Sequence, residues 1–105
     1  MSKAAVHRAP LRIPASHPAL PGHFPGRPIV PGVVLLQAVL DEAERWLGRE
    51  LAARSLPQAK FSAPLLPEQD AELELRLTKS ELRFSVTRAD QTVTQGMFAL
   101  AGPAA

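Results

Sequence analysis

Only one segment of this 105-residue chain has the residue spacing of a long helix, the stretch at residues 32–48. Its apolar side chains recur at intervals of three and four residues, the period of an α-helix, and Pro31 just before it suits a helix start. The apolar arc comprises Leu35, Leu36, Val39, Leu40, Ala43, Trp46 and Leu47. Between residues 33 and 40 the only polar residue is Gln37, so we expect the N-terminal half of the helix to be buried and its C-terminal half to be wetter.

After this segment the apolar period changes from 3.6 to 2, which indicates strands. Four strands are predicted at residues 58–62, 71–78, 81–88 and 92–100, and an earlier short strand at residues 10–14. The inward face of the last strand cannot be assigned from its pattern, and Gly96 within it indicates a bulge or a close backbone approach. Antiparallel strands with one apolar face need a cover, and the helix is the only candidate. We therefore expect an α+β fold, an antiparallel sheet around one helix, in a single domain over residues 1–105 with loose tails at 1–8 and 102–105.

Composition narrows the functions to be considered. The chain has no cysteine, which excludes disulfides, thiolate metal sites and a cysteine nucleophile, and fits a reducing compartment. Its net charge is +2 and its arginines are scattered singly, so a nucleic-acid partner is not expected. No apolar run approaches the roughly 20 residues that cross a bilayer, and the first residues lack the apolar core of a signal peptide, so we expect a cytoplasmic protein with no membrane partner. Because a chain this short buries a limited share of its surface, oligomerisation would supplement its stability.

A loop rich in proline and glycine precedes the predicted helix and contains His23. Proline fixes φ and glycine admits conformations that other residues avoid, so residues 22–32 should form a rigid, shaped loop. Such a loop could aim His23 at the helix start, where unpaired N–H groups and a partial positive charge suit a developing oxyanion. A base beside an oxyanion site is a catalytic arrangement. The alternative for His23 is a loop histidine that hydrogen-bonds local backbone.

The sequence HFPGRPIVPGV at residues 23–33 resembles the signature of the hot-dog-fold 3-hydroxyacyl-[acyl-carrier-protein] dehydratases, and KFSAPLLP at residues 60–67 resembles a second segment of that family. The likeness spans roughly residues 11–100. It implies a hot-dog fold and the dehydration of 3-hydroxyacyl thioesters to 2-enoyl thioesters, in fatty-acid or related secondary, polyketide-like biosynthesis. It also implies a homodimer or higher homo-oligomer with active sites at the subunit interface. The implied substrate is an acyl-carrier protein thioester or another acyl thioester, and no metal or diffusible cofactor is implied.

The resemblance assigns roles to individual residues. His23 takes the position of the catalytic base that removes the acidified C2 proton, and the backbone N–H at Gly32 would polarise the thioester carbonyl. Val33 and four other apolar helix residues could line an acyl tunnel, although core packing is the alternative for each: Leu36, Val39, Leu40 and Trp46. Of the remaining histidines, His17 is interpreted as structural or as part of a pocket rim, and His7 is given no role.

Gln37 departs from the family pattern, which places a carboxylate of the partner subunit's central helix at this position. An amide can hold a hydroxyl or a water molecule but cannot donate a proton as a carboxylic acid does, and losing general acid catalysis typically costs about 10²–10⁴-fold in rate. The chain is then a slow dehydratase, a dehydratase whose acid comes from elsewhere, or a protein that binds acyl chains without chemistry. Asp41, one helical turn away, is the nearest substitute for the acid, at a distance of about 5.4 Å along the axis.

Two other functions remain open at this point. One is a hot-dog thioesterase that hydrolyses the acyl thioester. The other is a non-catalytic acyl-binding subunit that pairs with an active, carboxylate-bearing paralogue.

Overall fold

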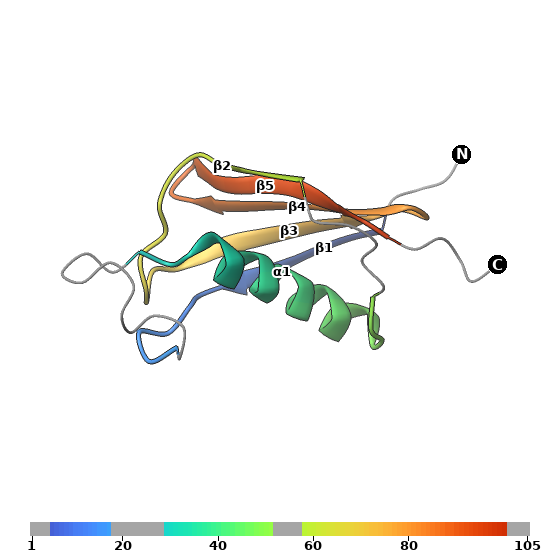
Figure 1. Cartoon of the computed structure of the whole chain (residues 1–105), viewed down its shortest axis with the longest axis horizontal. Coiled ribbons are helices and arrows are strands. Elements are labelled where there is room, and N and C mark those ends of the chain that lie inside the picture. Colours follow the sequence, from blue (N-terminus) through green and yellow to red (C-terminus); the bar gives the residue numbers. More distant parts are fainter. Residues whose placement is uncertain (1–4, 18–28, 52–57, 101–105) are drawn as a thin grey trace.

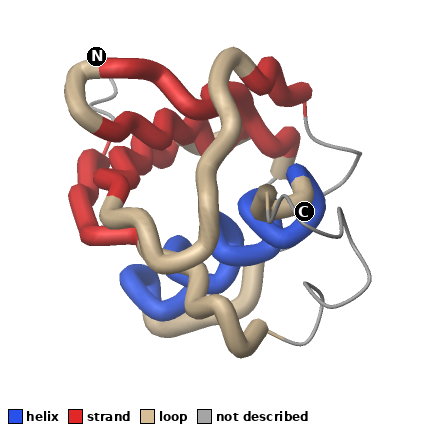
Figure 2. Tube along the Cα trace, turned by 90° about the vertical axis from the view of Figure 1, so that its left-hand side faces the viewer, coloured by secondary structure: helices blue, strands red, loops and turns tan. Residues whose placement is uncertain are grey.

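The structure, a computed structural model, describes residues 5–17, 29–51 and 58–100, which form one five-stranded antiparallel sheet and one helix (Figure 1). The elements in chain order are β1 (Ala5–Leu11), α1 (Gly32–Leu47), β2 (Gln58–Phe61), β3 (Ala71–Leu77), β4 (Glu81–Arg88) and β5 (Gln91–Ala99). The strand order in the sheet is β1-β3-β4-β5-β2. The helix lies in a second layer against one face of the sheet (Figures 1 and 2). The α+β prediction, a sheet around one helix, is confirmed.

The helix begins and ends where the sequence predicts. Pro31 precedes it in an extended conformation, and Gly48 ends it at φ 70° while its N–H donates to the carbonyl of Glu44 at 2.8 Å. The expectation of a more buried N-terminal half is confirmed in part: three of the four buried helix residues lie there, but Val33 is 72% exposed and Gln37 is also exposed. The sheet covers only one side of α1, so one side chain in each turn points away from it. The buried side chains of the helix are Val34, Leu35, Val39 and Ala43.

The register of the strands settles which residues of β5 face the helix. Val86 lies opposite Thr94, and Leu82 lies opposite Phe98, so Thr94 and Phe98 share the inward face with the buried residues of β4. Val93 is buried as well, next to a register shift in the pairing of β4 with β5. Two consecutive buried residues interrupt the alternation, which explains why the sequence pattern does not reveal this face.

The N-terminal part of the chain differs from the prediction. The sequence predicts a strand at residues 10–14 and a loose tail at residues 1–8, whereas β1 runs over Ala5–Leu11 and pairs with β3 along its whole length. Residues 5–8 are therefore part of the sheet, while residues 1–4 and 101–105 lie outside the described residues. Pro10 is tolerated because β1 is an edge strand, where a missing N–H donor does not interrupt the sheet.

Gly96 marks a close approach of two strands, one of the two alternatives that the sequence leaves open. It lies opposite Ala59 in the pairing of β2 with β5. A Cβ atom at this position would lie 1.9 Å from the carbonyl oxygen of Gln58 and 2.8 Å from the Cα of Ala59. The short strand β2 can therefore pair with β5 only because residue 96 has no side chain.

Candidate functional site

Among the residues that the structure describes, no side chain caps the start of α1. The N–H groups of Val34 and Leu35 donate to the carbonyl of Pro31 at 3.0 and 3.2 Å. Pro31 makes no side-chain cap, and the first turn contains no acidic residue. The positive end of the helix dipole therefore remains available at Gly32, within the described part of the chain.

An apolar cavity of about 550 Å³ lies at this end of the helix. Residues 29–32 and Leu35 form one wall, and residues 61–65, which include the last residue of β2, form the other. The ring of Phe61 packs on Gly32 so closely that a Cβ atom there would lie 2.8 Å from its Cζ. Phe61 itself is 48% exposed. The uncapped helix start and the apolar cavity therefore lie together. A ligand with an apolar chain and a carbonyl group needs both, the cavity for the chain and the N–H groups of the helix start to polarise the carbonyl.

The acyl-tunnel residues expected from the sequence do not line this cavity. Leu35 is the helix side chain that does, together with Gly32. Val39 is fully buried in the core, Val33 is exposed, and Trp46 stacks on His7 at the other end of the helix. Leu36 and Leu40 are partly buried and pack against the core, so for them too the alternative of core packing fits better.

Gln37 and Asp41 form a pair on the exposed side of α1. The Nε2 of Gln37 lies 2.8 Å from the Oδ1 of Asp41. A carboxylate can only accept, so the amide nitrogen donates and the Oε1 of Gln37 points elsewhere. Neither residue lines the apolar cavity. Asp41 instead lines a hollow of about 340 Å³ between α1 and residues 10–12.

His23, the expected base, lies outside the described residues. Of the other two histidines, His17 lies in a turn in which its N–H donates to the carbonyl of Pro14 at 3.0 Å. The structure therefore places Gly32 at the apolar cavity and leaves the position of His23 relative to it as a prediction. It does not bring Val33, Gln37 or Asp41 into that cavity within one chain.

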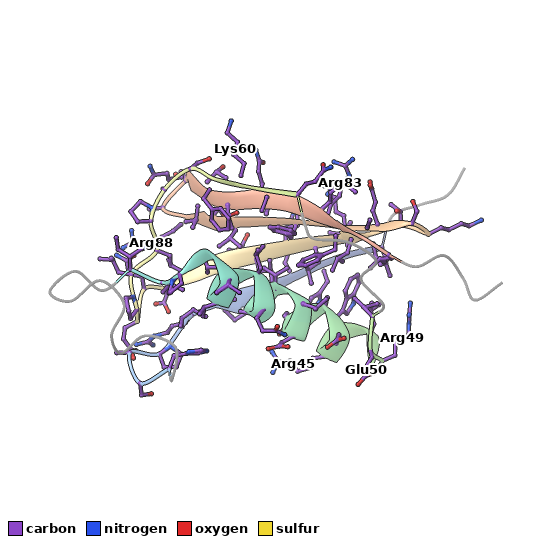
Figure 3. All side chains as sticks on the ribbon, in the orientation of Figure 1. Arg45, Arg49, Glu50, Lys60, Arg83 and Arg88 are labelled. Atoms are coloured by element: carbon purple, nitrogen blue, oxygen red, sulfur yellow. The ribbon has the colours of Figure 1, made fainter. Side chains whose placement is uncertain are left out.

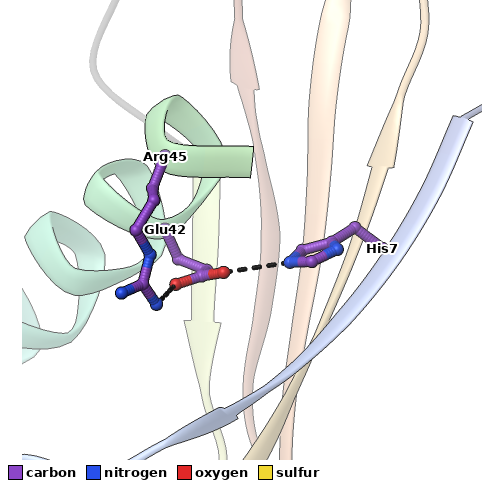
Figure 4. Close-up of polar contacts among 3 residues, drawn as sticks. All are labelled: His7, Glu42 and Arg45. Carbon is purple, nitrogen blue, oxygen red and sulfur yellow. Dashed lines mark hydrogen bonds and ion pairs between the residues drawn. The ribbon is translucent and has the colours of Figure 1, made fainter. Parts of the chain in front are cut away.

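His7 joins a polar cluster that sequence reasoning missed (Figure 4). Its Nε2 lies 2.9 Å from the Oε2 of Glu42, and its ring stacks on Trp46 with 4.9 Å between ring centroids. Arg45 forms an ion pair with the other oxygen of Glu42. The cluster joins β1 to the C-terminal half of α1. The available signal was the alternation of His7 with Ala9 and Leu11, which puts all three on the inward face of β1.

The pKa of Glu42 reflects this environment. Partial burial raises it, but hydrogen bonds from His7 and Arg45 outweigh the burial, so the pKa lies below the usual glutamate value. A carboxyl group with a lowered pKa in the folded state stabilises the fold above its titration range and loses that contribution as the pH falls through it.

We therefore expect Glu42→Gln to reduce the free energy of unfolding at neutral pH by about 1–2 kcal/mol, with a smaller difference from wild type under acid conditions. Chemical denaturation at a series of pH values would measure this. The control is Glu50→Gln, which replaces an exposed carboxylate beyond the end of α1. A Glu42→Gln deficit that stays constant into acid would contradict the assignment.

The outer face of the sheet carries a polar hollow of about 500 Å³ that is separate from the apolar cavity. Arg76 and Arg83 lie opposite each other there, and each pairs with a glutamate of its own strand, Glu74 at 3.1 Å and Glu81 at 2.7 Å. The side chains of Lys60 and Arg83 point away from the helix (Figure 3). The two arginines are paired with neighbouring carboxylates, and Lys60 is exposed to solvent. We therefore interpret this face as a solvated surface.

Neither a metal site nor a membrane span is found in the described part of the chain. Its His, Asp and Glu side chains form no group of three that could hold a metal ion. Its one helix does not have the length and apolar character needed to cross a membrane.

Comparison with known proteins identifies the family to which the chain belongs. Residues 2–97 match the family model ApeI-like, described as ApeI dehydratase. Two curated relatives are 3-hydroxyacyl-[acyl-carrier-protein] dehydratases FabZ. The protein from Herpetosiphon aurantiacus is 28% identical over 85 residues, which are 74% of this chain and 60% of the relative. The protein from Haemophilus influenzae is 33% identical over 75 residues, which are 64% of this chain and 51% of the relative.

The chain thus spans about half to three-fifths of the length of these relatives. A solved structure, the dehydratase heterocomplex ApeI:P from Xenorhabdus doucetiae, aligns with a TM-score of 0.78 and 28% identity, covering 96% of this chain and 99% of that one. An uncharacterized protein from Erwinia carotovora subsp. atroseptica aligns with a TM-score of 0.74 at 24% identity, covering 97% of this chain and 87% of that one, which supports the fold alone. The chain therefore has the hot-dog fold and belongs to the ApeI-like dehydratase family.

Proposed function

We propose that this chain dehydrates 3-hydroxyacyl thioesters, carried on an acyl-carrier protein, to 2-enoyl thioesters in fatty-acid or related secondary biosynthesis. The observation that carries the proposal is an apolar cavity at an uncapped helix start, in a chain that matches a dehydratase family over residues 2–97. In this proposal the acyl chain enters the cavity, and the thioester carbonyl lies at the N–H groups that begin α1.

The reaction has one proton to remove and one leaving group to assist. His23, as a neutral imidazole, takes the C2 proton as the general base. Negative charge then develops on the thioester oxygen, where the helix N-terminus at Gly32 stabilises it. The electron pair of the broken C2–H bond forms the C2–C3 double bond, and the hydroxyl at C3 leaves as water once it has received a proton.

Gln37 limits which group supplies that last proton. Its Nε2 is engaged with Asp41, so its Oε1 can accept a hydrogen bond from the substrate hydroxyl and hold it in place. The amide has no proton acidic enough to donate to the leaving hydroxide. Because neither residue reaches the cavity of its own chain, we propose that the partner subunit's Gln37 and the partner subunit's Asp41 orient the hydroxyl, and that the acid is contributed by another group.

A second candidate function follows from the same residues: the chain pairs with a carboxylate-bearing paralogue. Gln37 and Asp41 lie on an exposed side of α1, outside the cavity of their own chain. The relative from Xenorhabdus doucetiae was solved as a heterocomplex. Of the two sheet edges, β1 carries Pro10, which obstructs strand addition, whereas β2 ends in the exposed Phe61, whose ring packs on Gly32. We propose that a partner chain, identical or paralogous, adds to the sheet at β2.

Mass spectrometry of an intact 3-hydroxyacyl carrier protein tests the proposed function. The wild-type chain is expected to remove the mass of one water from the carrier. Release of the free carrier thiol would instead identify a thioesterase. An unchanged carrier that loses water only after a carboxylate-bearing paralogue is added would identify a subunit of a heteromeric enzyme.

In the same assay Gln37→Glu is expected to raise kcat by about 10²-fold or more if the homo-oligomer is the active form, because the variant restores a general acid. Gln95→Glu, which adds the same charge on the outer face of the sheet, is the matched control and should leave kcat unchanged. Equal rates for wild type and Gln37→Glu would show that position 37 does not face the leaving hydroxyl.

A further inference from the structure

We propose that the turn at residues 65–68 is the base that holds both ends of the loop containing His23, and that Glu68 is a positioning residue for that base. The inference rests on the proposed function, since it concerns the placement of the catalytic histidine. The contacts that carry it all lie on either side of the stretch at 18–28.

The downstream end of the stretch is attached to the first residue of the turn. The N–H of Val30 donates to the carbonyl of Leu65 at 2.8 Å. Leu65 is 1% exposed and Val30 is 4% exposed, so this bond lies in the core. Val30 also borders the apolar cavity and comes directly before Pro31, so the attachment fixes the entry of the chain into α1.

The upstream end is attached to Glu68 through three contacts. The N–H of Glu68 donates to the carbonyl of Ile13 at 2.8 Å. Its carboxylate accepts a hydrogen bond from the N–H of Ala15 at 2.7 Å and pairs with the guanidinium of Arg12 at 2.5 Å. A single residue therefore binds backbone groups of two residues and the side chain of a third.

The backbone of Glu68 supports a role for its side chain. Its φ is 68°, in the left-handed region where a residue with a Cβ is strained and glycine is not. Neighbouring contacts define this turn: the N–H of Gln69 donates to the carbonyl of Leu66 at 3.3 Å, and the N–H of Leu66 donates to the Oε1 of Gln69 at 3.0 Å. Glycine would adopt such a turn without strain. A strained residue whose carboxylate contacts two residues more than 50 positions away is a feature expected where position matters for function.

The charge on Glu68 fits the same role. The N–H of Ala15, followed by the guanidinium of Arg12, lowers the pKa of this exposed carboxyl below the usual glutamate value. The carboxylate is therefore ionised, and able to accept both contacts, throughout the neutral range.

The consequence for catalysis is geometric. Residues 12–15 and residue 30 are held by one short turn, so the segments before and after the stretch that contains His23 are kept at a fixed separation, and the second of them borders the cavity. A displacement of about 1 Å between a base and its proton can cost about 10²-fold in rate. Releasing the upstream end should therefore slow the proton transfer without changing the groups that bind the acyl chain.

Three substitutions test this proposal on the full chain. Glu68→Ala removes the carboxylate and keeps the backbone strain, Glu68→Gly removes both, and Glu68→Gln keeps an acceptor of the same reach for the N–H of Ala15. Glu81→Gln removes another carboxylate that is paired with an arginine, far from the turn, and serves as the control. The readouts are hydrogen exchange of the Ala15 amide, thermal melting, and kcat and KM for water loss from a 3-hydroxyacyl carrier protein.

We expect faster exchange at Ala15 and a kcat lowered by about 10- to 100-fold in Glu68→Ala and Glu68→Gly, with KM within about twofold of wild type. Glu68→Gln should recover most of kcat. Glu68→Gly should melt no lower than Glu68→Ala, because it relieves the strain. An equal loss of kcat in the two variants would then follow the missing carboxylate and not the stability of the fold. The control should match wild type in all three readouts.

Two results would overturn the proposal, and they separate it from the proposed function. In the first, the wild-type chain removes water and Glu68→Ala is equally fast despite faster exchange at Ala15. This result refutes the positioning role of Glu68 and leaves the proposed function standing. A wild-type chain that removes no water, alone or with a paralogue, refutes the proposed function and the positioning role with it.

Discussion

Replacing His23 by alanine is expected to lower kcat for water loss from a 3-hydroxyacyl carrier protein by at least about 10²–10⁴-fold, the usual contribution of general acid–base catalysis. We expect neither of the other two histidines to substitute for it. His7 is engaged with Glu42 and Trp46 between β1 and α1, and His17 is held in a turn with Pro14. Steady-state rates from intact-mass spectra would measure the loss.

The control for this variant is a measurement of its thermal stability. Thermal melting of His23→Ala should be measured beside wild type, because an unchanged melting temperature shows that the described core, formed by α1 and the inward face of the sheet, remains packed. A variant that melts as wild type and removes water at the wild-type rate would show that the base is another residue.

Gly96→Ala is expected to lower the free energy of unfolding by about 3 kcal/mol or more, at the upper end of the range for overpacking substitutions. The new Cβ atom would lie 1.9 Å from the carbonyl oxygen of Gln58, and backbone atoms cannot move aside as the end of a flexible side chain can. Strand β2 must then shift away from β5. Because Phe61 ends β2 and forms a wall of the apolar cavity, the cavity should open as well.

Gly48→Ala is the matched control for Gly96→Ala in chemical denaturation. Gly48 has φ 70°, and among the described residues no atom outside its chain neighbours lies within 4 Å of the place that an alanine methyl group would take. Alanine there adds strain without a clash and should cost about 1 kcal/mol. Equal effects of the two substitutions would contradict a close approach of β2 and β5 at Gly96.

The sequence predicts the parts of the fold whose periodicity is strong. Helix α1 and strands β3 and β4 agree with their predicted bounds within one or two residues, because each has an apolar face that the core must cover. The predicted strand at the N-terminus starts too late, because Val6, Arg8 and Pro10 on the outer face of β1 do not form a pattern that indicates an edge strand. The length of β1 is set by its pairing with β3. The inward face of β5 depends on a register shift that belongs to two strands together.

The candidate site is predictable only where residues close in the sequence form it. The start of the helix at Gly32 follows from the local proline and glycine pattern, and the departure at Gln37 follows from the resemblance to a family. The packing of Phe61 on Gly32 and the hydrogen bond between Ala15 and Glu68 each join segments more than 25 residues apart, for which the sequence has no local signal. For the same reason, the pairing of His7 with Glu42, 35 residues apart, becomes visible only in the fold.

The reverse reaction in deuterium oxide tests directly whether His23 exchanges a proton with C2 beside the start of α1. A 2-enoyl carrier protein would be incubated with the wild-type chain, with the paralogue present if water loss requires it, and the acyl group analysed by mass spectrometry. We expect addition of one water with one non-exchangeable deuterium at C2, and neither change with His23→Ala. Equal deuterium incorporation by His23→Ala, or cleavage of the thioester in place of hydration, would contradict a base at His23.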